Sequence, residues 1–246
     1  GDAFKIRSVA PVSKYAQQTG EPTIAAMNRA TLFTLDPRER GTNKIAGTPA
    51  SYGKNPKFSC SATSESGNLC VGSETGELRL YSGVPGSSRG GSRHPKTAKT
   101  LLPGFGDPIK SVDVSADGRW VLATCETYLL VVNTVMPDSD STGFTSRMGK
   151  AKPVPRRLQL LPEDVRAVGG KVKFTPAMFN LGCDGETWLV TSTGPYIITW
   201  NFRKVKQGNL SEYSVRECRG RRGRADSKVC RSSGWTRRSW RSNSRP

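Results

Sequence analysis

The 246-residue chain lacks long apolar runs, metal-ligand motifs and a signal-like segment. Its longest apolar stretch, around residues 128–132, is far shorter than the roughly 18 residues that a membrane-spanning helix needs. One His and six Cys without a CxxC pair argue against the common zinc spacings and a dense disulfide framework, so a reduced, cytoplasmic compartment is expected. The chain begins at Gly1 without an initiator Met, which predicts a fragment or a processed chain.

Acidic residues are also scarce, since 20 Asp and Glu stand against 38 Lys and Arg, a net charge of +18. Residues 208–246 hold eleven of these bases and three acids, with few aliphatic residues, which predicts a disordered basic tail over 209–246. Two interpretations of this Arg- and Ser-rich tail stay open. It is either an arm with Trp235 and Trp240 that binds nucleic acid or acidic partners, or a solvated terminus or reading-frame artefact.

A repeated pattern of short apolar strands and polar turns is present before the tail. Its clearest copy spans residues 109–134, where Asp117 and Gly118 lie in a turn and Trp120 begins the next strand. Glycine supplies positive φ and aspartate supplies local hydrogen bonds, so these residues favour hairpins. Residues 58–82 and 179–201 repeat the pattern, and a weaker copy ends at residues 31–36.

The spacing of the copies predicts the fold. The corresponding positions Ala26, Gly72, Thr124 and Thr191 are 46, 52 and 67 residues apart, close to the ~40–50 residues of a propeller blade with loop insertions. A small sheet has two apolar faces that only stacked neighbours can bury. We therefore expect an all-β fold over residues 1–208, a partial WD-repeat-like β-propeller of about four blades.

Several residues have the character of blade signatures with a structural role. Trp200 and Asn201 end a third strand where WD-repeat blades carry Trp-Asp, and the aromatic side chains are expected to pack between blades. Asp113 precedes the turn at Ser115, so its carboxylate is expected to accept hydrogen bonds from turn amides.

Three segments carry a family resemblance: GDPIKSVDVSADGRWVLATCETYLLVV (106–132), PRRLQLLPE (155–163) and TSTGPYIITWNFRKVKQG (191–208). They closely resemble the C-terminal WD-repeat-like region of the vacuolar import and degradation protein 27 family, and GFTSRMGK (143–150) fits as well. The resemblance covers about residues 9–208 and implies a non-enzymatic, mainly cytosolic propeller. It implies a link to vacuolar delivery and degradation of proteins in fungi, and to growth and organised cell division in plant relatives.

The candidate catalytic residues are few. His94 lies in a Gly- and Ser-rich stretch (86–96) with no adjacent carboxylate and no second His, which argues against a catalytic triad or a zinc site. The stretch also lacks the GxxxxGK[ST] pattern of a phosphate-binding loop. Cys60, Cys70 and Cys125 are expected to be buried small hydrophobes. The sequence thus predicts no enzyme activity, no cofactor and no metal.

The loops offer a candidate interaction face. Loops from each third strand to the outer strand share one rim of a propeller, and outer strands are expected near residues 97–102 and 157–161. This predicts a basic face formed by Arg89, Arg93, Lys96, Arg147, Lys150, Lys152 and Arg156. The opposite rim is predicted to carry the acids Glu74, Asp107, Glu126, Glu163 and Asp164.

Two functions remain open for this face, beside the interpretation that its loops are solvated and bind nothing. The first is a scaffold that binds other, unidentified proteins. The second is an electrostatic binder of nucleic acid or anionic membrane, acting through the basic loops and tail. The second function predicts the steeper loss of affinity with salt.

Overall fold

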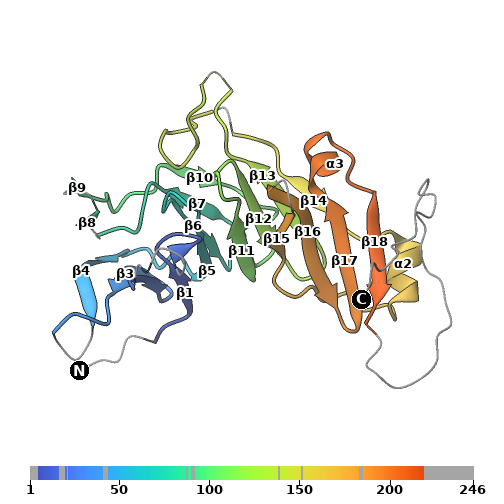
Figure 1. The fold of residues 1–246 in the computed structure, drawn as a ribbon, viewed down its shortest axis with the longest axis horizontal. Helices are drawn as coiled ribbons and strands as arrows, with labels where there is room; N and C mark the ends of the chain where they lie inside the picture. The colour runs from blue at the N-terminus through green and yellow to red at the C-terminus, as the bar shows by residue number, and fades with distance from the viewer. Residues whose placement is uncertain are drawn as a thin grey trace, which may run out of the picture.

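The fold consists of four four-stranded antiparallel sheets that follow one another along the chain, here called blades 1 to 4 (Figure 1). A computed structural model describes residues 5–16, 20, 22–40, 44–86, 88–89, 92–137, 139–150, 152–182 and 185–218. The tail beyond residue 218, with Trp235 and Trp240, lies outside these residues. The arrangement confirms the predicted all-β fold of about four blades.

Each blade is a simple meander of strands in sequence order. Blade 1 contains β1 (Ser8–Pro11), β2 (Ile24–Met27), β3 (Thr31–Leu35) and β4 (Ile45–Ser51). Blade 2 contains β5 (Phe58–Thr63), β6 (Leu69–Ser73), β7 (Leu78–Tyr81) and β10 (Thr100–Leu102), with the small hairpin of β8 (Ser88–Arg89) and β9 (Ser92–Arg93) inserted before β10. Blade 3 contains β11 (Ser111–Val114), β12 (Trp120–Thr124), β13 (Leu129–Asn133) and β14 (Arg156–Leu158). Blade 4 contains β15 (Met178–Gly182), β16 (Gly185–Thr193), β17 (Tyr196–Asn201) and β18 (Tyr213–Glu217).

Two short helices lie in the connections of the last two blades. These are α2 (Pro162–Ala167) and α3 (Phe202–Lys206). Among the residues that the structure describes, no helix is long and apolar enough to cross a membrane.

The turn between β11 and β12 shows why the repeat folds as it does. Gly118 has a φ of +70°, which a residue without a Cβ adopts at little cost, and its amide donates to the Ser115 carbonyl at 2.9 Å. The Asp117 carboxylate accepts from the Arg119 amide at 2.9 Å, and the Ser115 hydroxyl accepts from the Trp120 amide at 2.9 Å. The local hydrogen bonds predicted for this turn are therefore present.

Apolar side chains fill the three junctions between neighbouring blades. At the junction of blades 3 and 4, for example, Leu122 and Val131 pack in one cluster with Leu189 and Ile198. The first strands of successive blades also contact one another, β1 with β5, β5 with β11 and β11 with β15. Stacking sheets in this way buries faces that a single blade would leave exposed to water.

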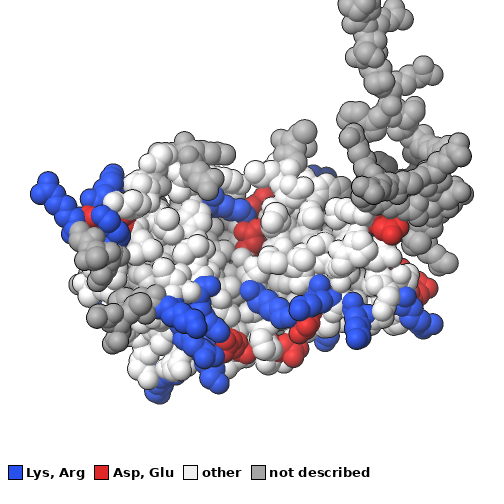
Figure 2. All heavy atoms as spheres, turned by 90° about the horizontal axis from the view of Figure 1, so that it is seen from below, with Lys and Arg blue, Asp and Glu red and all other residues white. Residues whose placement is uncertain are grey.

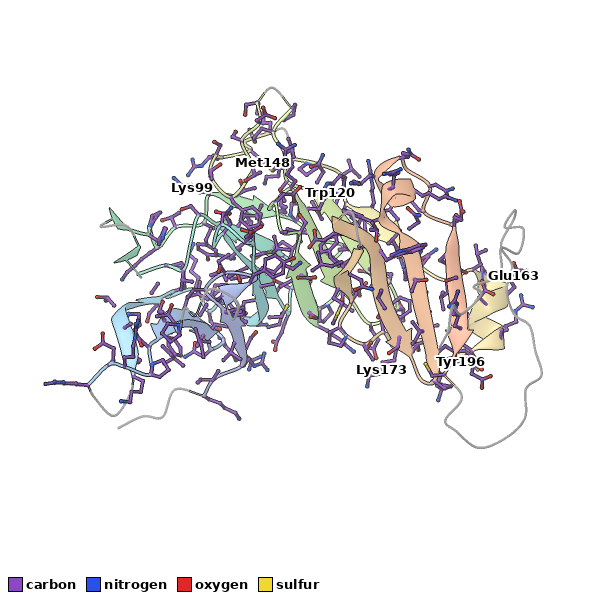
Figure 3. The ribbon with its side chains drawn as sticks, in the orientation of Figure 1. Lys99, Trp120, Met148, Glu163, Lys173 and Tyr196 are labelled. Carbon is purple, nitrogen blue, oxygen red and sulfur yellow. The ribbon has the colours of Figure 1, made fainter. Side chains whose placement is uncertain are left out.

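The connections between strands gather at two rims. In blades 2 to 4 the upper rim, on the side of Lys99, Trp120 and Met148 in Figure 3, carries the connections from first to second and from third to fourth strands. The lower rim, on the side of Lys173 and Tyr196, carries the remaining connections.

Two predicted boundaries need correction. The outer strand of blade 3 spans residues 156–158 rather than 157–161, whereas that of blade 2 lies within the expected 97–102. The propeller does not end at residue 208, because β18 pairs with β17 and completes blade 4. Residues 209–218 therefore belong to the fold and not to a disordered tail.

Candidate functional site

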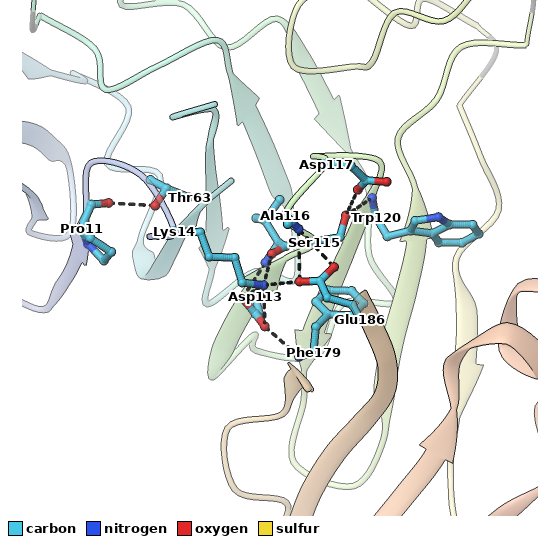
Figure 4. Close-up of polar contacts among 11 residues, drawn as sticks. Pro11, Lys14, Thr63, Asp113, Ser115, Ala116, Asp117, Trp120, Phe179 and Glu186 are labelled. Atoms are coloured by element: carbon cyan, nitrogen blue, oxygen red, sulfur yellow. Dashed lines mark hydrogen bonds and ion pairs between the residues drawn. The ribbon is translucent and has the colours of Figure 1, made fainter. Parts of the chain in front are cut away.

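A partly buried ion-pair cluster joins three blades at the upper rim (Figure 4). Lys14 follows β1, and its ammonium lies 2.8 Å from Glu186 Oε1 of blade 4 and 3.2 Å from Asp113 Oδ1 of blade 3. It also donates to the Val114 carbonyl. The three charged side chains, only 9–18% exposed, are called the three-blade cluster below.

The two carboxylates of this cluster are fully used by structural contacts. Asp113 Oδ2 accepts from the Phe179 amide of β15 at 2.8 Å, and its Oδ1 accepts from the Val114 amide at 2.8 Å. Both oxygens of Glu186 accept from the Ala116 amide at 3.1 Å. Asp113 was expected to bond turn amides, yet one oxygen binds an amide of its own strand and the other an amide of the next blade. The residue types alone gave no sign of Lys14 or Glu186 as its partners.

The signature aromatic residues lie at the junction of blades 3 and 4. Trp200 is completely buried and stacks edge-on against Phe174, with ring centroids 6.3 Å apart. Trp120 is half-buried, and its ring meets that of Phe202 at 5.6 Å. Asn201 caps α3 by accepting from the Lys204 amide at 3.2 Å. These contacts stabilise the junction between the two blades.

The long connection between β13 and β14 packs onto blade 2. Phe144 and Met148 are buried in the cluster between blades 2 and 3. On the outer strand of blade 2, the Thr100 hydroxyl accepts from the Met148 amide and donates to the Ser146 carbonyl, both at 3.3 Å. Buried apolar side chains hold this loop in place, whereas a loop with charged side chains only would stay in solvent. The intervening Arg147 is therefore held beside blade 2.

The predicted basic face is brought together only in part. Lys96, Arg147, Lys150 and Lys152 are exposed on the upper-rim connections of blades 2 and 3, and they are called the basic ridge below. In the described part of the chain none of the four forms an ion pair. Arg89 and Arg93 belong to the β8–β9 hairpin, and their side chains lie outside the described residues.

For Arg156 the structure gives a different role. Its guanidinium donates to the Val205 carbonyl at 2.6 Å and lies over the Trp120 ring at 5.3 Å. Both partners belong to the junction of blades 3 and 4, so Arg156 is occupied by a contact between blades. The sequence could not show this, because Arg156 and Val205 are 49 residues apart.

The lower rim is not the acidic surface that the sequence predicted. Glu74 pairs with Arg7 and Arg29, and Glu126 pairs with Lys110. The Arg7 and Arg29 hydrogen bonds lower the pKa of Glu74. Figure 2, which views the molecule from this side, shows Lys and Arg interspersed with Asp and Glu. The predicted acids do lie in the connections of this rim, but Glu74 and Glu126 are paired with bases, so the surface is mixed in charge.

The remaining predicted acids of this rim contact tyrosines or lie on α2. Asp107 accepts from the Tyr128 hydroxyl at 2.7 Å, and Asp164 accepts from the Tyr213 hydroxyl. Glu163 lies beside Asp164 in the first turn of α2.

Three of the four described cysteines lie in the buried interior between blades 2 and 3. Cys60, Cys70 and Cys125 are buried free thiols, as predicted, and burial raises the pKa of each. His94 packs beside Gly83 in the connection that carries β8 and β9. Within the described ranges, no group of three or more His, Cys, Asp or Glu residues could hold a metal ion.

Four stacked, meandering blades with structural polar clusters at their rims define a protein of the WD40-like β-propeller class. The family described as the VID27 C-terminal WD40-like domain matches residues 1–225. The chain belongs to this family.

Two curated relatives agree with the family. The vacuolar import and degradation protein 27 of Schizosaccharomyces pombe is 37% identical over 224 residues, which cover 87% of this chain and 27% of that protein. The Saccharomyces cerevisiae protein of the same name is 36% identical over 220 residues, which cover 84% of this chain and 26% of that protein. The chain thus spans about a quarter of the length of these relatives.

A likeness to a solved structure concerns the fold alone. Hydrazine synthase of Kuenenia stuttgartiensis superposes with a TM-score of 0.52 at 15% sequence identity, covering 88% of this chain and 51% of that one.

Proposed function

We propose that the chain is a non-enzymatic scaffold that binds acidic segments of other proteins through the basic ridge. The observation that carries the proposal is the anchoring of the β13–β14 connection on blade 2 by Phe144 and Met148. It gives Arg147 a fixed position on the same rim as Lys96 of the neighbouring blade. A pre-positioned group of charges binds at a lower entropic cost than one on free loops.

The family name supports the biological setting. Both curated relatives are named for vacuolar import and degradation, so we place the scaffold in cytoplasmic protein trafficking toward that fate. The absence of a catalytic role is part of the same proposal. It is supported by the carboxylates Asp113, Glu186 and Asp107, each of which is engaged in a structural hydrogen bond.

Charge reversal on the ridge tests the scaffold role. The double variant Arg147→Glu/Lys150→Glu is titrated with a fluorescent peptide rich in Asp and Glu and containing aromatic residues. We expect the dissociation constant to rise at least about tenfold, because attraction at the rim becomes repulsion. The matched control is Lys171→Glu/Lys173→Glu, which makes the same change of net charge on exposed lower-rim residues. Equal losses in both variants would show that only net charge matters and would contradict the proposal.

A second candidate function is the binding of nucleic acid or of an anionic membrane. It is favoured because the bases of the basic ridge form no ion pair in the described part of the chain. Such bases can equally neutralise the phosphates of nucleic acid or of an anionic membrane. Titrating the same protein with a single-stranded oligonucleotide and with phosphatidylserine vesicles at several salt concentrations separates the candidates. A plot of the logarithm of the association constant against the logarithm of the salt concentration gives the slope. A slope near −0.7 per neutralised phosphate, with tighter binding than the peptide shows, would favour the oligonucleotide.

A further inference from the structure

An exposed aromatic side chain lies on the lower rim between blades 2 and 3. Phe105, in the connection from β10 to β11, is 53% exposed. Its ring centroid lies 6.2 Å from that of Tyr128, which is buried in the turn before β13. Blades 2 and 3 each have a described blade on both sides, so this surface belongs to the middle of the series.

The connection that carries Phe105 is held in a fixed position. Gly104 packs so closely on the turn between β6 and β7 that a Cβ there would overlap a backbone carbonyl oxygen. Gly106 has a φ of +92°, a conformation that favours glycine. The Asp107 carboxylate accepts a hydrogen bond from the Tyr128 hydroxyl at 2.7 Å. Phe105 is therefore presented to solvent from a fixed backbone, which lowers the entropic cost of using it in binding.

A guanidinium lies against the same tyrosine ring. Arg157 of β14 is exposed, and its guanidinium carbon is 4.1 Å from the centroid of the Tyr128 ring. Contact with a ring orients a guanidinium without using its N–H donors. In the described part of the chain these donors form no hydrogen bond and no ion pair. They are therefore available to an acceptor on another molecule.

The other charged groups around Tyr128 already have partners. Lys110 pairs with Glu126 at 3.1 Å, and Asp107 is bound by the Tyr128 hydroxyl. Arg157 is thus the charged group of this surface that lacks a counter-ion among the described residues. An exposed ring and an open guanidinium that contact one buried ring match a ligand with an apolar side chain close to a carboxylate.

We propose that Phe105, Tyr128 and Arg157 form a docking site for a segment of another protein in which an acidic residue lies beside a large apolar one. The carboxylate accepts paired hydrogen bonds from the Arg157 guanidinium, and the apolar side chain packs on Phe105. Aromatic and Arg side chains of this kind supply much of the binding energy at protein interfaces. This lower-rim site is separate from the basic ridge on the opposite rim, so one chain can hold two partners at once.

Fluorescence anisotropy of a short labelled peptide gives the direct test. The peptide holds one Glu–Phe pair in a sequence otherwise rich in Gly and Ser. Phe105→Ala and Arg157→Gln are each expected to raise its dissociation constant at least about tenfold. The matched controls Leu161→Ala and Arg166→Gln, on exposed residues in and next to α2, leave it unchanged. Far-UV circular dichroism verifies folding. Arg157→Lys replaces Arg157→Gln should the latter unfold, since Lys cannot donate the paired hydrogen bonds.

A second peptide, with Gln in place of Glu, tests which contact each side chain makes. It should bind the wild-type chain more weakly and respond to Phe105→Ala but not to Arg157→Gln. The ridge variant Arg147→Glu/Lys150→Glu should bind the first peptide as the wild type does, so failure of the ridge proposal leaves this site standing. The lower-rim site is overturned by absence of binding of the first peptide, by equal losses in the controls, or by an undiminished effect of Arg157→Gln on the second peptide.

Discussion

The buried thiols illustrate how single side chains respond to the blade junctions. Cys60 lies between blades 2 and 3, and burial raises the pKa of its thiol to about 11 from an ordinary value of 9.0. Because the raised pKa belongs to the folded state, folding favours the neutral thiol. Its contribution to stability is complete below pH 9 and is lost as the pH rises through about 11.

Alkaline unfolding of Cys60→Ala measures this contribution. Between pH 9 and 11 the free energy of unfolding of the wild-type protein should fall by up to about 2 kcal/mol more than that of the variant. Urea titrations at a series of pH values provide the measurement. The control is Cys218→Ala, which removes an exposed thiol instead of a buried one. Parallel curves for wild type and Cys60→Ala would contradict the prediction.

The roles of individual residues were predictable from the sequence only where their partners are close in the chain. Asp117 and Gly118 could be assigned to a turn because their hydrogen-bond partners lie within two or three residues. Arg156 was misassigned, since its carbonyl partner Val205 comes from the next blade. Lys14 was missed altogether, because nothing in its local sequence distinguishes it from an exposed lysine.

Among the elements, β18 closes blade 4 and also fixes α2. The Tyr213 hydroxyl accepts from the Leu161 amide at 2.7 Å and donates to the Asp164 carboxylate. Burial and this carboxylate raise the pKa of Tyr213. The strand was assigned to the tail because its sequence, YSVRE, is short and precedes the Arg-rich residues. Pairing with β17, which no local pattern reveals, determines its structure.

Removing one hydroxyl tests the connection between β18 and α2. Tyr213→Phe should lower the free energy of unfolding by about 2 kcal/mol, because two hydrogen bonds, one of them to a charged group, are lost. Thermal or urea unfolding provides the measurement. Tyr196→Phe, on the neighbouring strand at the lower rim, is the matched control and should change stability little. Equal effects of the two substitutions would show that the hydroxyl contacts of Tyr213 contribute nothing.

Across the whole molecule, the three-blade cluster is the contact that links the most distant parts of the described chain. Lys14 belongs to the blade 1 side, whereas its carboxylate partners lie in blades 3 and 4. Apolar junctions join neighbouring blades only, so this cluster adds a direct link from the first blade to the last. The repeated sequence pattern predicted the blades and their order. It could not predict a contact between non-adjacent blades, because a repeat indicates only how neighbouring units stack.

Truncating Lys14 should therefore destabilise the entire fold. Lys14→Ala leaves Asp113 and Glu186 as partly buried, uncompensated charges, and we expect a loss of about 3 kcal/mol in the free energy of unfolding. Lys150→Ala, an exposed lysine on the same rim, should change stability by less than about 0.5 kcal/mol. Urea unfolding followed by circular dichroism compares the two. A loss as small as that of the control would show that the cluster is not stabilising.

The separation of Lys14 and Glu186 has a consequence for biosynthesis. The two residues are 172 positions apart, so at about 5–20 residues per second a ribosome needs about 9–34 s to add the second after the first. During that interval the Lys14 ammonium lacks at least one of its two acidic partners, since Asp113 is also made 99 residues after it. Molecular chaperones that hold nascent chains therefore have their longest opportunity to act on the first blades, well before the last one leaves the exit tunnel.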